Sequence, residues 1–202
     1  MNNRDQLKEK LALACRLLYR EGLMDHAGLA GARVPGENLL VLNPRTMRGT
    51  RGRHPGIMRP ADMVVVDLEG KKIEGQNDPP SETPIFTGVF RARSDIHACL
   101  HLHLPWATLF STVGRPLVPI YNLAAVFGKK VPVHPDPNLI QTDVQGRAVA
   151  KSLGKARALI LRSHGAVLIG EDVESVFVAS VIFEENSKRL YDASLLGKPR
   201  PL

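Results

Sequence analysis

The sequence predicts a mixed α/β fold in one compact globular domain, and three observations point to it. Apolar runs of strand length stand before helical patterns repeatedly along the chain, an order typical of α/β proteins. A length of 202 residues suits one compact domain whose core needs no disulfide or structural metal. Hydrophobic residues make up 44% and charged residues 23% of the chain, which excludes disorder. No repeat, low-complexity tract or linker interrupts it, so we interpret residues 1–202 as a single domain.

The first part of the chain predicts a helix, an irregular segment and three strands. Leu7, Leu11 and Leu18 recur at helical spacing, and Gly22 ends this pattern. The Gly-rich stretch 25–36 is expected to be irregular. Apolar runs rich in β-branched residues and leucine, separated by a Glu-Gly turn, then indicate strands that include a hairpin. The predicted elements are a helix at 5–21 and strands at 38–43, 63–68 and 73–75.

The remainder of the chain alternates strands with helices. The Pro-Ser-Glu-Thr-Pro segment at 80–84 is typical of a helix start, with Ser81 or Thr83 near the cap. A long helical periodicity begins at Asp172, after a further apolar run. The predicted elements are helices at 80–91, 105–110 and 172–193 and strands at 96–104 and 158–162.

The charge balance favours a small anionic substrate over nucleic acid. Lys and Arg number 27 against 20 Asp and Glu, a net charge of +7, and such an excess raises the question of nucleic-acid binding. The excess is scattered, apart from Arg48, Arg51, Arg53 and His54 in one loop, and aromatic residues for base stacking are only 5% of the chain. We therefore predict a small anionic substrate and no nucleic-acid partner.

The N-terminal residues and the cysteines indicate a cytoplasmic protein. Met1 to Lys10 are polar and charged, without the apolar core of a signal peptide, and no apolar run approaches the roughly 20 residues that span a bilayer. We therefore expect no membrane partner. Cys15 and Cys99 stand far apart in apolar surroundings. This favours buried free thiols, while a disulfide between them stays open.

The strongest local feature is the run Leu100-His-Leu-His-Leu104. Successive side chains of a strand point to opposite faces, so His101 and His103 share one face and the leucines share the other. Two imidazoles one strand pitch apart are able to converge on a metal ion. A pair of surface histidines is the alternative, and the motif alone leaves both interpretations open.

Two further polar residues stand at the ends of predicted elements. His164 closely follows the apolar run that ends at Arg162, and strand ends are where site residues gather in α/β proteins. A histidine bonded only to backbone is the alternative there. Glu82 stands at a predicted helix start, where a carboxylate is either an ordinary helix-start residue or a ligand or proton acceptor. The local pattern does not separate these roles.

The ordered combination of motifs resembles the class II aldolase/adducin family. The resemblance runs from about Arg20 to Gly197, nearly the whole chain. Its motifs are Asp78-Pro-Pro-Ser-Glu-Thr-Pro-Ile85, Arg93-Ser-Asp-Ile96, His101-X-His103, Arg162-Ser-His-Gly-Ala-Val-Leu-Ile-Gly170, and Glu184 on the following helix.

This resemblance implies a fold and a site. The implied fold is a three-layer α/β/α domain around a mainly antiparallel central sheet, assembled as a homotetramer with active sites at subunit interfaces. His101, His103 and His164 are implied as ligands of a divalent metal ion and Glu82 as the catalytic carboxylate. Three imidazoles suit zinc, while a chelating carboxylate substrate also suits manganese. In such a carbon–carbon lyase the cation stabilises an enolate, and the carboxylate manages the proton.

Departures from the family pattern bear on the substrate. Members that cleave sugar phosphates hold the phosphate with a Gly-Asn-X-Ser segment and with Ser-Ser before the Glu, whereas this chain has Gly28-Leu-Ala-Gly31 and Pro80-Ser81. A phosphate would lose several hydrogen-bond donors there. The segments Ala32-Arg-Val-Pro-Gly36 and Leu42-Asn-Pro44 instead resemble the branch that contains decarboxylases of hydroxylated aromatic dicarboxylates.

Further candidate residues are expected around the predicted centre. We predict substrate binding by Ser81, Arg33 and Arg162, since a guanidinium pairs with a carboxylate through two parallel hydrogen bonds. A structural role is the alternative for Arg162. Tyr121 lies in the region from which family members donate a catalytic Tyr across the interface, with a packed core Tyr as the alternative. His134 either lines the pocket or decorates a loop.

Three functions remain as hypotheses. The leading one is decarboxylation of a small hydroxylated, aromatic carboxylic acid. An aldolase that cleaves a non-phosphorylated hydroxy-oxo acid or hydroxy aldehyde is the alternative. Leu29 and Phe86 stand where many members carry His, which leaves the identity of the substrate open. An adducin-like binding module without catalysis is the third, and the presence of all three ligand histidines together with Glu82 counts against it.

Overall fold

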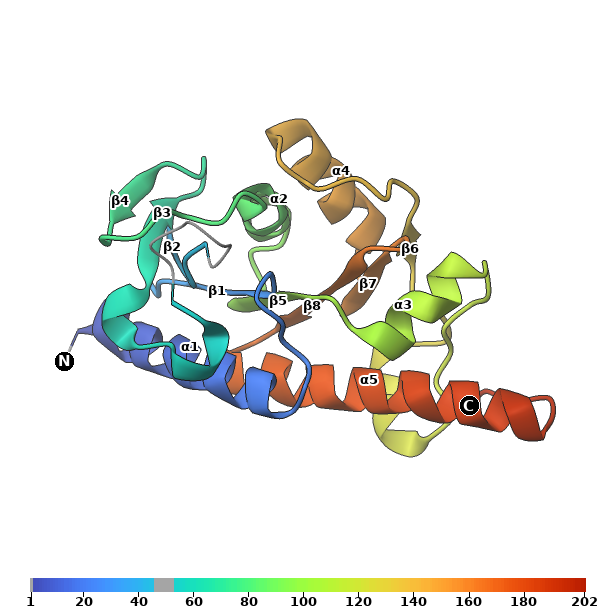
Figure 1. The fold of residues 1–202 in the computed structure, drawn as a ribbon. Helices are drawn as coiled ribbons and strands as arrows, with labels where there is room; N and C mark the ends of the chain where they lie inside the picture. Colours follow the sequence, from blue (N-terminus) through green and yellow to red (C-terminus); the bar gives the residue numbers. More distant parts are fainter. Residues whose placement is uncertain (1, 46–52) are drawn as a thin grey trace.

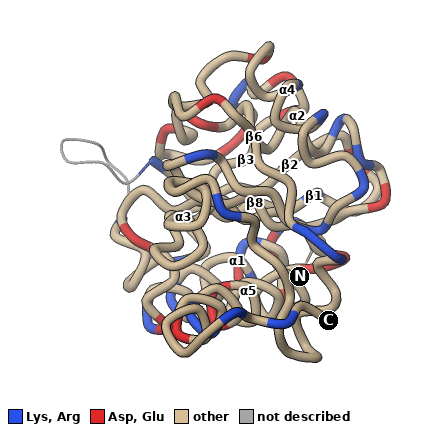
Figure 2. Tube along the Cα trace, turned by 90° about the vertical axis from the view of Figure 1, so that its right-hand side faces the viewer, with Lys and Arg blue, Asp and Glu red and all other residues tan. Residues whose placement is uncertain are grey.

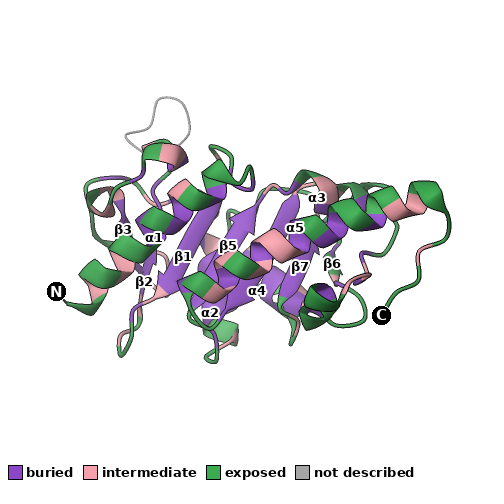
Figure 3. Ribbon diagram, turned by 90° about the horizontal axis from the view of Figure 1, so that it is seen from below, coloured by how far each residue is buried: buried purple, intermediate pink, exposed green. Residues whose placement is uncertain are grey.

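The computed structural model describes residues 2–45 and 53–202. Within these residues the chain forms one eight-stranded sheet with helices on both faces (Figure 1). Helices α1 and α5 run side by side across one face, as Figure 3 shows from below. Helices α2 and α4 pack against each other on the opposite face. The predicted three-layer α/β/α fold is confirmed.

The sheet is mainly antiparallel, as predicted, in the order β4-β3-β2-β1-β5-β8-β7-β6. Strands β6 and β7 are parallel, whereas the other neighbouring strands are antiparallel. Because β5 lies between β1 and β8, three segments distant in sequence meet at the centre of the sheet. The strands are β1 Leu29–Arg33, β2 Leu39–Leu42, β3 Val64–Asp67, β4 Lys72–Glu74, β5 Ala98–Leu102, β6 Val133–His134, β7 Ala158–Leu161 and β8 Gly165–Gly170.

Local sequence signals account for where several helices begin. Asn2 caps α1 by accepting a hydrogen bond from the backbone amide of Asp5, and α4 and α5 begin with the capping boxes of Thr142 and Asp172. The α-helices are α1 Asn3–Arg20, α2 Thr83–Ala92, α3 Pro105–Thr112, α4 Asp143–Leu153 and α5 Val173–Leu196, with 3-10 turns at Pro55–Ile57, Pro60–Asp62 and Asn122–Phe127.

The sheet divides the interior into two cores, and β5 contributes to both. Leu100 and Leu102 belong to the core under α1 and α5, while Cys99 belongs to the core under α2 and α4. Side chains alternate along a strand, so His101 points to the same side as Cys99, toward α2. Both faces of this strand are therefore buried, and His101 has no exposed surface.

Several sequence predictions of secondary structure need correction. Residues 25–36 are not irregular throughout, because β1 lies within them and pairs with both β2 and β5. The glycines and alanines of this central strand lack the hydrophobic alternation by which a strand is predicted. The predictions also omitted β6, β8 and α4. Neither Ser81 nor Thr83 caps α2: Glu82 occupies the cap position, and its side chain makes no capping bond. The carboxylate is thus free for another role.

Other expectations concern cysteines, membranes and charge. Cys15 and Cys99 are both buried free thiols. Among the described residues, no helix is both long enough and apolar enough to cross a membrane. Basic and acidic residues are interspersed along the chain trace (Figure 2). Of the predicted basic loop, Arg48 and Arg51 lie outside the described residues, while Arg53 forms an ion pair with Asp62 at 2.7 Å.

Candidate metal centre

His101 is oriented by the sheet itself. Its Nδ1 lies 3.2 Å from the carbonyl oxygen of Ala166 on β8, and β8 pairs with β5 over this stretch. A carbonyl oxygen only accepts, so Nδ1 carries the proton and Nε2 keeps its lone pair. Among the described residues Nε2 is buried without a hydrogen-bond partner. The imidazole therefore presents a metal-binding nitrogen away from the strand.

His103 stands just past the end of β5 and is held by a side chain rather than by backbone. Its Nδ1 lies 3.0 Å from Oδ2 of Asp25, in the turn between α1 and β1. Its Nε2 is likewise buried and unpartnered within the described residues. Asp25 lies 78 positions from His103 in sequence, and no local sequence pattern marks it as a partner of this histidine.

A tight turn between β7 and β8 brings His164 to the other two histidines. Ser163 adopts a left-handed conformation with φ of 56°, which is uncommon for a residue with a Cβ atom. Gly165, directly after His164, lies so close to β5 that an added Cβ would stand 2.6 Å from the carbonyl oxygen of Leu102. The glycine thus allows the two strand ends to meet, and the ring centroids of His101 and His164 are 4.9 Å apart.

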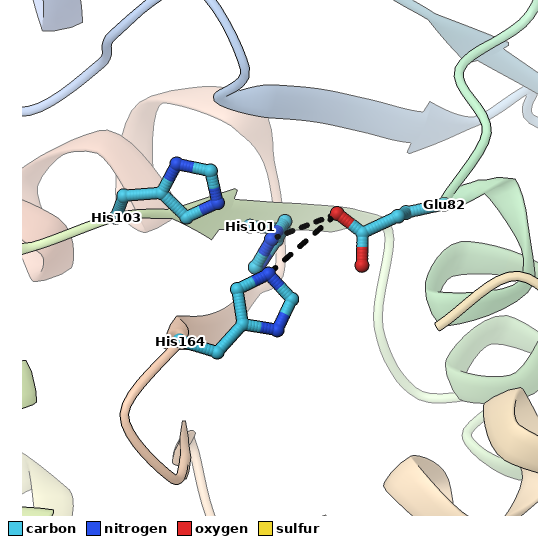
Figure 4. Close-up of side chains that lie close together, drawn as sticks. All are labelled: Glu82, His101, His103 and His164. Carbon is cyan, nitrogen blue, oxygen red and sulfur yellow. Dashed lines mark ion pairs between the residues drawn. The ribbon is translucent and has the colours of Figure 1, made fainter. Parts of the chain in front are cut away.

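Glu82 completes the cluster from the start of helix α2, in the helix layer that faces His101 (Figure 4). Its Oε1 accepts a hydrogen bond of 2.9 Å from the backbone amide of Ile140. Its Oε2 faces the histidines, 3.5 Å from Nε2 of His101 and 3.7 Å from Nε2 of His164. The carboxylate is therefore fixed through one oxygen and offers the other to the cluster.

The donor set fits a divalent cation. One ligand atom from each of Glu82, His101, His103 and His164 lies within 4.8 Å of the others. Tetrahedral donors with bonds of about 2.1 Å to one ion stand about 3.4 Å apart, and the distances of 3.5 Å and 3.7 Å from Oε2 of Glu82 to Nε2 of His101 and of His164 are close to this value. Buried imidazole nitrogens without partners are costly, and a cation would satisfy them. Three imidazoles and a carboxylate suit zinc or manganese.

The electrostatics of the cluster favour the ligand forms of His101 and Glu82, whereas the hydrogen bond to Asp25 raises the pKa of His103. Burial lowers the pKa of His101, which keeps the imidazole neutral as a ligand must be. The hydrogen bond to His103 lowers the pKa of Asp25 to about 2. Burial acts to raise the pKa of Glu82, but contacts with His101 and His164 outweigh it and hold the pKa below its ordinary value. Both carboxylates are thus ionised at neutral pH.

The structure brings some of the predicted substrate-binding residues near the cluster and not others. Ser81 directly precedes Glu82 in the chain, and Arg162 is exposed two positions before His164. Arg33 lies at the other end of β1, because Leu29 pairs with His101 four residues away, a span of roughly 13 Å along a strand. Its guanidinium donates to the carbonyl oxygen of Phe90.

Tyr121 and His134 have partners away from the four-residue cluster. The hydroxyl of Tyr121 donates to Oε2 of Glu185 on α5 at 3.1 Å, and burial, together with this bond, raises its pKa to about 12. Nδ1 of His134 lies 2.8 Å from the hydroxyl oxygen of Ser152 on α4. Within this single chain neither side chain contacts Glu82 through a described hydrogen bond.

Glu184, part of the family-like pattern, binds the backbone at the start of α3 and not the four-residue cluster. Its two carboxylate oxygens accept hydrogen bonds of 2.7 Å and 3.0 Å from the backbone amides of Trp106 and Ala107. These amides belong to the first turn of α3, which otherwise lacks side-chain capping. Since α3 begins two residues after His103, this carboxylate fixes the segment that leaves the centre.

Comparison with known proteins agrees with the geometry. The family described as Class II Aldolase and Adducin N-terminal domain matches residues 9–191. The chain is 29% identical to a 3,4-dihydroxyphthalate decarboxylase of Arthrobacter keyseri over 185 residues, which is 86% of this chain and 73% of that protein. It is 28% identical to a 5-deoxy-D-ribulose 1-phosphate aldolase of Bacillus thuringiensis serovar kurstaki over 144 residues, 71% of this chain and 67% of that one.

Solved structures give the same result. An L-fuculose 1-phosphate aldolase superposes with a TM-score of 0.87 at 25% identity, covering 98% of this chain and 90% of that chain. The sequence match spans the whole sheet and all four residues of the cluster. The chain therefore belongs to the class II aldolase and adducin family.

Proposed function

We propose that this protein is a metal-dependent carbon–carbon lyase that decarboxylates a small hydroxylated aromatic carboxylic acid. The observation that carries the lyase assignment is the convergence of Glu82, His101, His103 and His164. A divalent cation bound there would supply positive charge beside the substrate's hydroxyl and carboxylate oxygens. A binding module without catalysis has no need for such buried, unpartnered nitrogens.

Glu82 is the residue to which we assign proton transfer. When a carboxylate leaves as carbon dioxide, the bonding electron pair stays on the ring carbon, and that carbon must take a proton. Oε2 faces the cluster, while Oε1 is held by Ile140, so the ionised carboxylate would take up the proton of the substrate's hydroxyl group at Oε2 and return it to the ring carbon from one direction. A positioned carboxyl group of this kind is a general acid–base catalyst.

The segment that should hold a phosphate is poorly suited to one. The amide of Gly28 donates to the carbonyl oxygen of Asp25 at 3.3 Å, and the amide of Ala30 donates to Oδ1 of Asn43 at 2.7 Å. Leu29 between them belongs to the core under α2 and α4. Two backbone donors are thus used and no polar side chain replaces them, which supports a carboxylate substrate over a phosphate ester.

We assign recognition of a substrate carboxylate to Arg162 and Ser81. Arg162 is exposed beside His164, and its backbone amide is tied to the carbonyl oxygen of His134 at 3.0 Å. The side chain therefore extends from a fixed backbone position. Arg33, whose guanidinium packs 5.2 Å from the centre of the Phe90 ring at the far end of β1, is not assigned to this site.

Aldol cleavage remains the second candidate because aldolases are among the similar proteins. A side-by-side panel with zinc-loaded and manganese-loaded protein separates the two. We expect ortho-hydroxylated aromatic acids to release carbon dioxide and sugar phosphates to be poor substrates. Efficient release of an aldehyde from a ketose phosphate, with no carbon dioxide from any hydroxy acid, would contradict the decarboxylase assignment. Loss of all activity on removing the metal is expected in either case.

A further inference from the structure

We propose that Asp25 is a positioning residue for the metal centre, which sets the tautomer and ring orientation of His103. This inference rests on the proposed metal-dependent function. It concerns a residue that the family-like motifs do not include and that lies 78 positions from the histidine in sequence.

The contact between the two side chains defines which nitrogen is free. Oδ2 of Asp25 lies 3.0 Å from Nδ1 of His103. A carboxylate only accepts, so it selects the tautomer with the proton on Nδ1 and leaves the lone pair on Nε2. Nε2 is the buried nitrogen that lacks a partner among the described residues. The carboxylate therefore directs the ligand atom of His103 into the cluster.

Asp25 is itself held in place. Its second oxygen, Oδ1, accepts a hydrogen bond of 3.0 Å from the amide of Ala27. The turn is closed by the amide of Gly28, which donates to the carbonyl oxygen of Asp25. The carbonyl oxygen of Gly28 in turn accepts from the side chain of the fully buried Asn43 at 3.2 Å. The carboxylate is thus fixed relative to the sheet before any ion binds.

The position of His103 explains why a side chain is needed. His101 lies inside β5, where a carbonyl oxygen of the neighbouring strand holds its Nδ1. His103 lies one residue beyond the last residue of β5, past the last paired position of the strand. The strand pairing that orients His101 is absent there among the described residues, and the Asp25 carboxylate takes over the same task.

The test measures metal affinity rather than turnover. Zn²⁺ binding is determined by competition with a chromogenic chelator for wild type, Asp25→Ala, Asp25→Asn and Asp67→Ala. Loss of a carboxylate that orients a ligand histidine weakens metal binding about 10–100-fold, which we expect for Asp25→Ala. Asn has one acceptor oxygen in place of two and no charge, so it keeps only one of the two contacts, and a loss smaller than that of Asp25→Ala is expected. Asp67 accepts two backbone amides in an exposed turn and is the matched control.

The outcomes are distinguishable. If wild type binds Zn²⁺ and both Asp25 variants bind within twofold of it, the positioning role is wrong and the metal centre stands. The role is also wrong if Asp67→Ala weakens binding as much as Asp25→Ala. If wild type binds no Zn²⁺, both proposals fail. Nitrogen chemical shifts of the neutral His103 ring, recorded without metal, give a second readout: Asp25→Ala should move the proton from Nδ1 toward Nε2, with circular dichroism verifying the fold.

Discussion

Glu82 has a structural task and a proposed catalytic task, and each involves a different carboxylate oxygen. Oε1 accepts from the Ile140 amide, and Oε2 faces His101 and His164. A side chain fixed in this way loses little conformational freedom when substrate binds. Its free oxygen is therefore already oriented for proton transfer to one atom of the substrate. The burial of Glu82 is also informative, because a buried carboxylate without partners would be strongly destabilising.

Replacing Glu82 by Gln separates these tasks. Gln keeps an acceptor for the Ile140 amide, and three histidines remain for the metal, so we expect an unchanged fold and retained metal. Turnover should fall by roughly 10²–10⁴-fold, because the amide does not transfer the proton. The measurements are steady-state kinetics and metal content on the same sample. A rate near that of wild type would limit Glu82 to a structural role at the start of α2.

At the level of elements, the contact between α2 and α4 holds two parts of the site together. Helix α2 begins directly after Glu82, and the Ile140 segment that bonds to this carboxylate leads into α4. The helices approach until their backbones touch: a Cβ added at Gly146 would collide with the carbonyl oxygen of Pro84, and one at Gly88 would collide with that of Gly146. Glycine is required at this crossing for steric reasons.

Gly146→Ala tests this contact through the sign of its effect. In an unobstructed helix, Ala stabilises relative to Gly by about 1 kcal/mol. Here the collision with Pro84 should instead lower the free energy of unfolding by about 1–3 kcal/mol. Val144→Ala, which removes an exposed side chain of the same helix, is the control. Chemical denaturation measures the free energy of unfolding of both variants. A Gly146→Ala protein more stable than wild type would contradict the prediction, because it would show that the two helices move apart without loss of stability.

At the level of the whole molecule, the surface around α3 and α5 suggests self-association. Val113, Leu195 and Leu196 are exposed large apolar side chains, the last with 93% of its surface accessible, and such apolar surface is typical of protein–protein contacts. The homotetramer implied by the family resemblance would cover surface of this kind. Tyr121, bonded to Glu185 on α5, lies away from its own cluster, so its proposed catalytic role requires a neighbouring subunit.

Subunit mixing tests that role. Tyr121→Phe and Glu82→Gln proteins are expected to be weakly active alone, because each lacks one acid–base group. If Tyr121 serves the site of a neighbour, tetramers reassembled from equal amounts of both should regain about a quarter of wild-type activity, since some sites pair an intact Glu82 with an intact Tyr121. Mixing without reassembly is the control. If no activity returns after reassembly, Tyr121 does not serve a neighbouring site, and its role is limited to the contact with Glu185.

The sequence by itself determined the fold class, most elements and the four residues of the centre. Apolar periodicity is a local property, so the long helix α5 and strands such as β3 and β7 follow from it. The ligand set could be predicted because the ordered combination of motifs resembles a known family, whereas each motif alone left the role of its residue open. Strand β1 was missed because its glycine and alanine side chains carry almost no hydrophobic pattern.

Only the tertiary structure decided which side chains support that centre and which lie too far away. Asp25 contacts His103, and Ile140 contacts Glu82, across 78 and 58 positions of sequence, and neither contact has a local signal. The register of β1 against β5 likewise places Leu29, and not Arg33, beside His101. Strand register depends on long-range pairing of backbone groups, so the position of a residue along the chain does not reveal which end of the sheet it reaches.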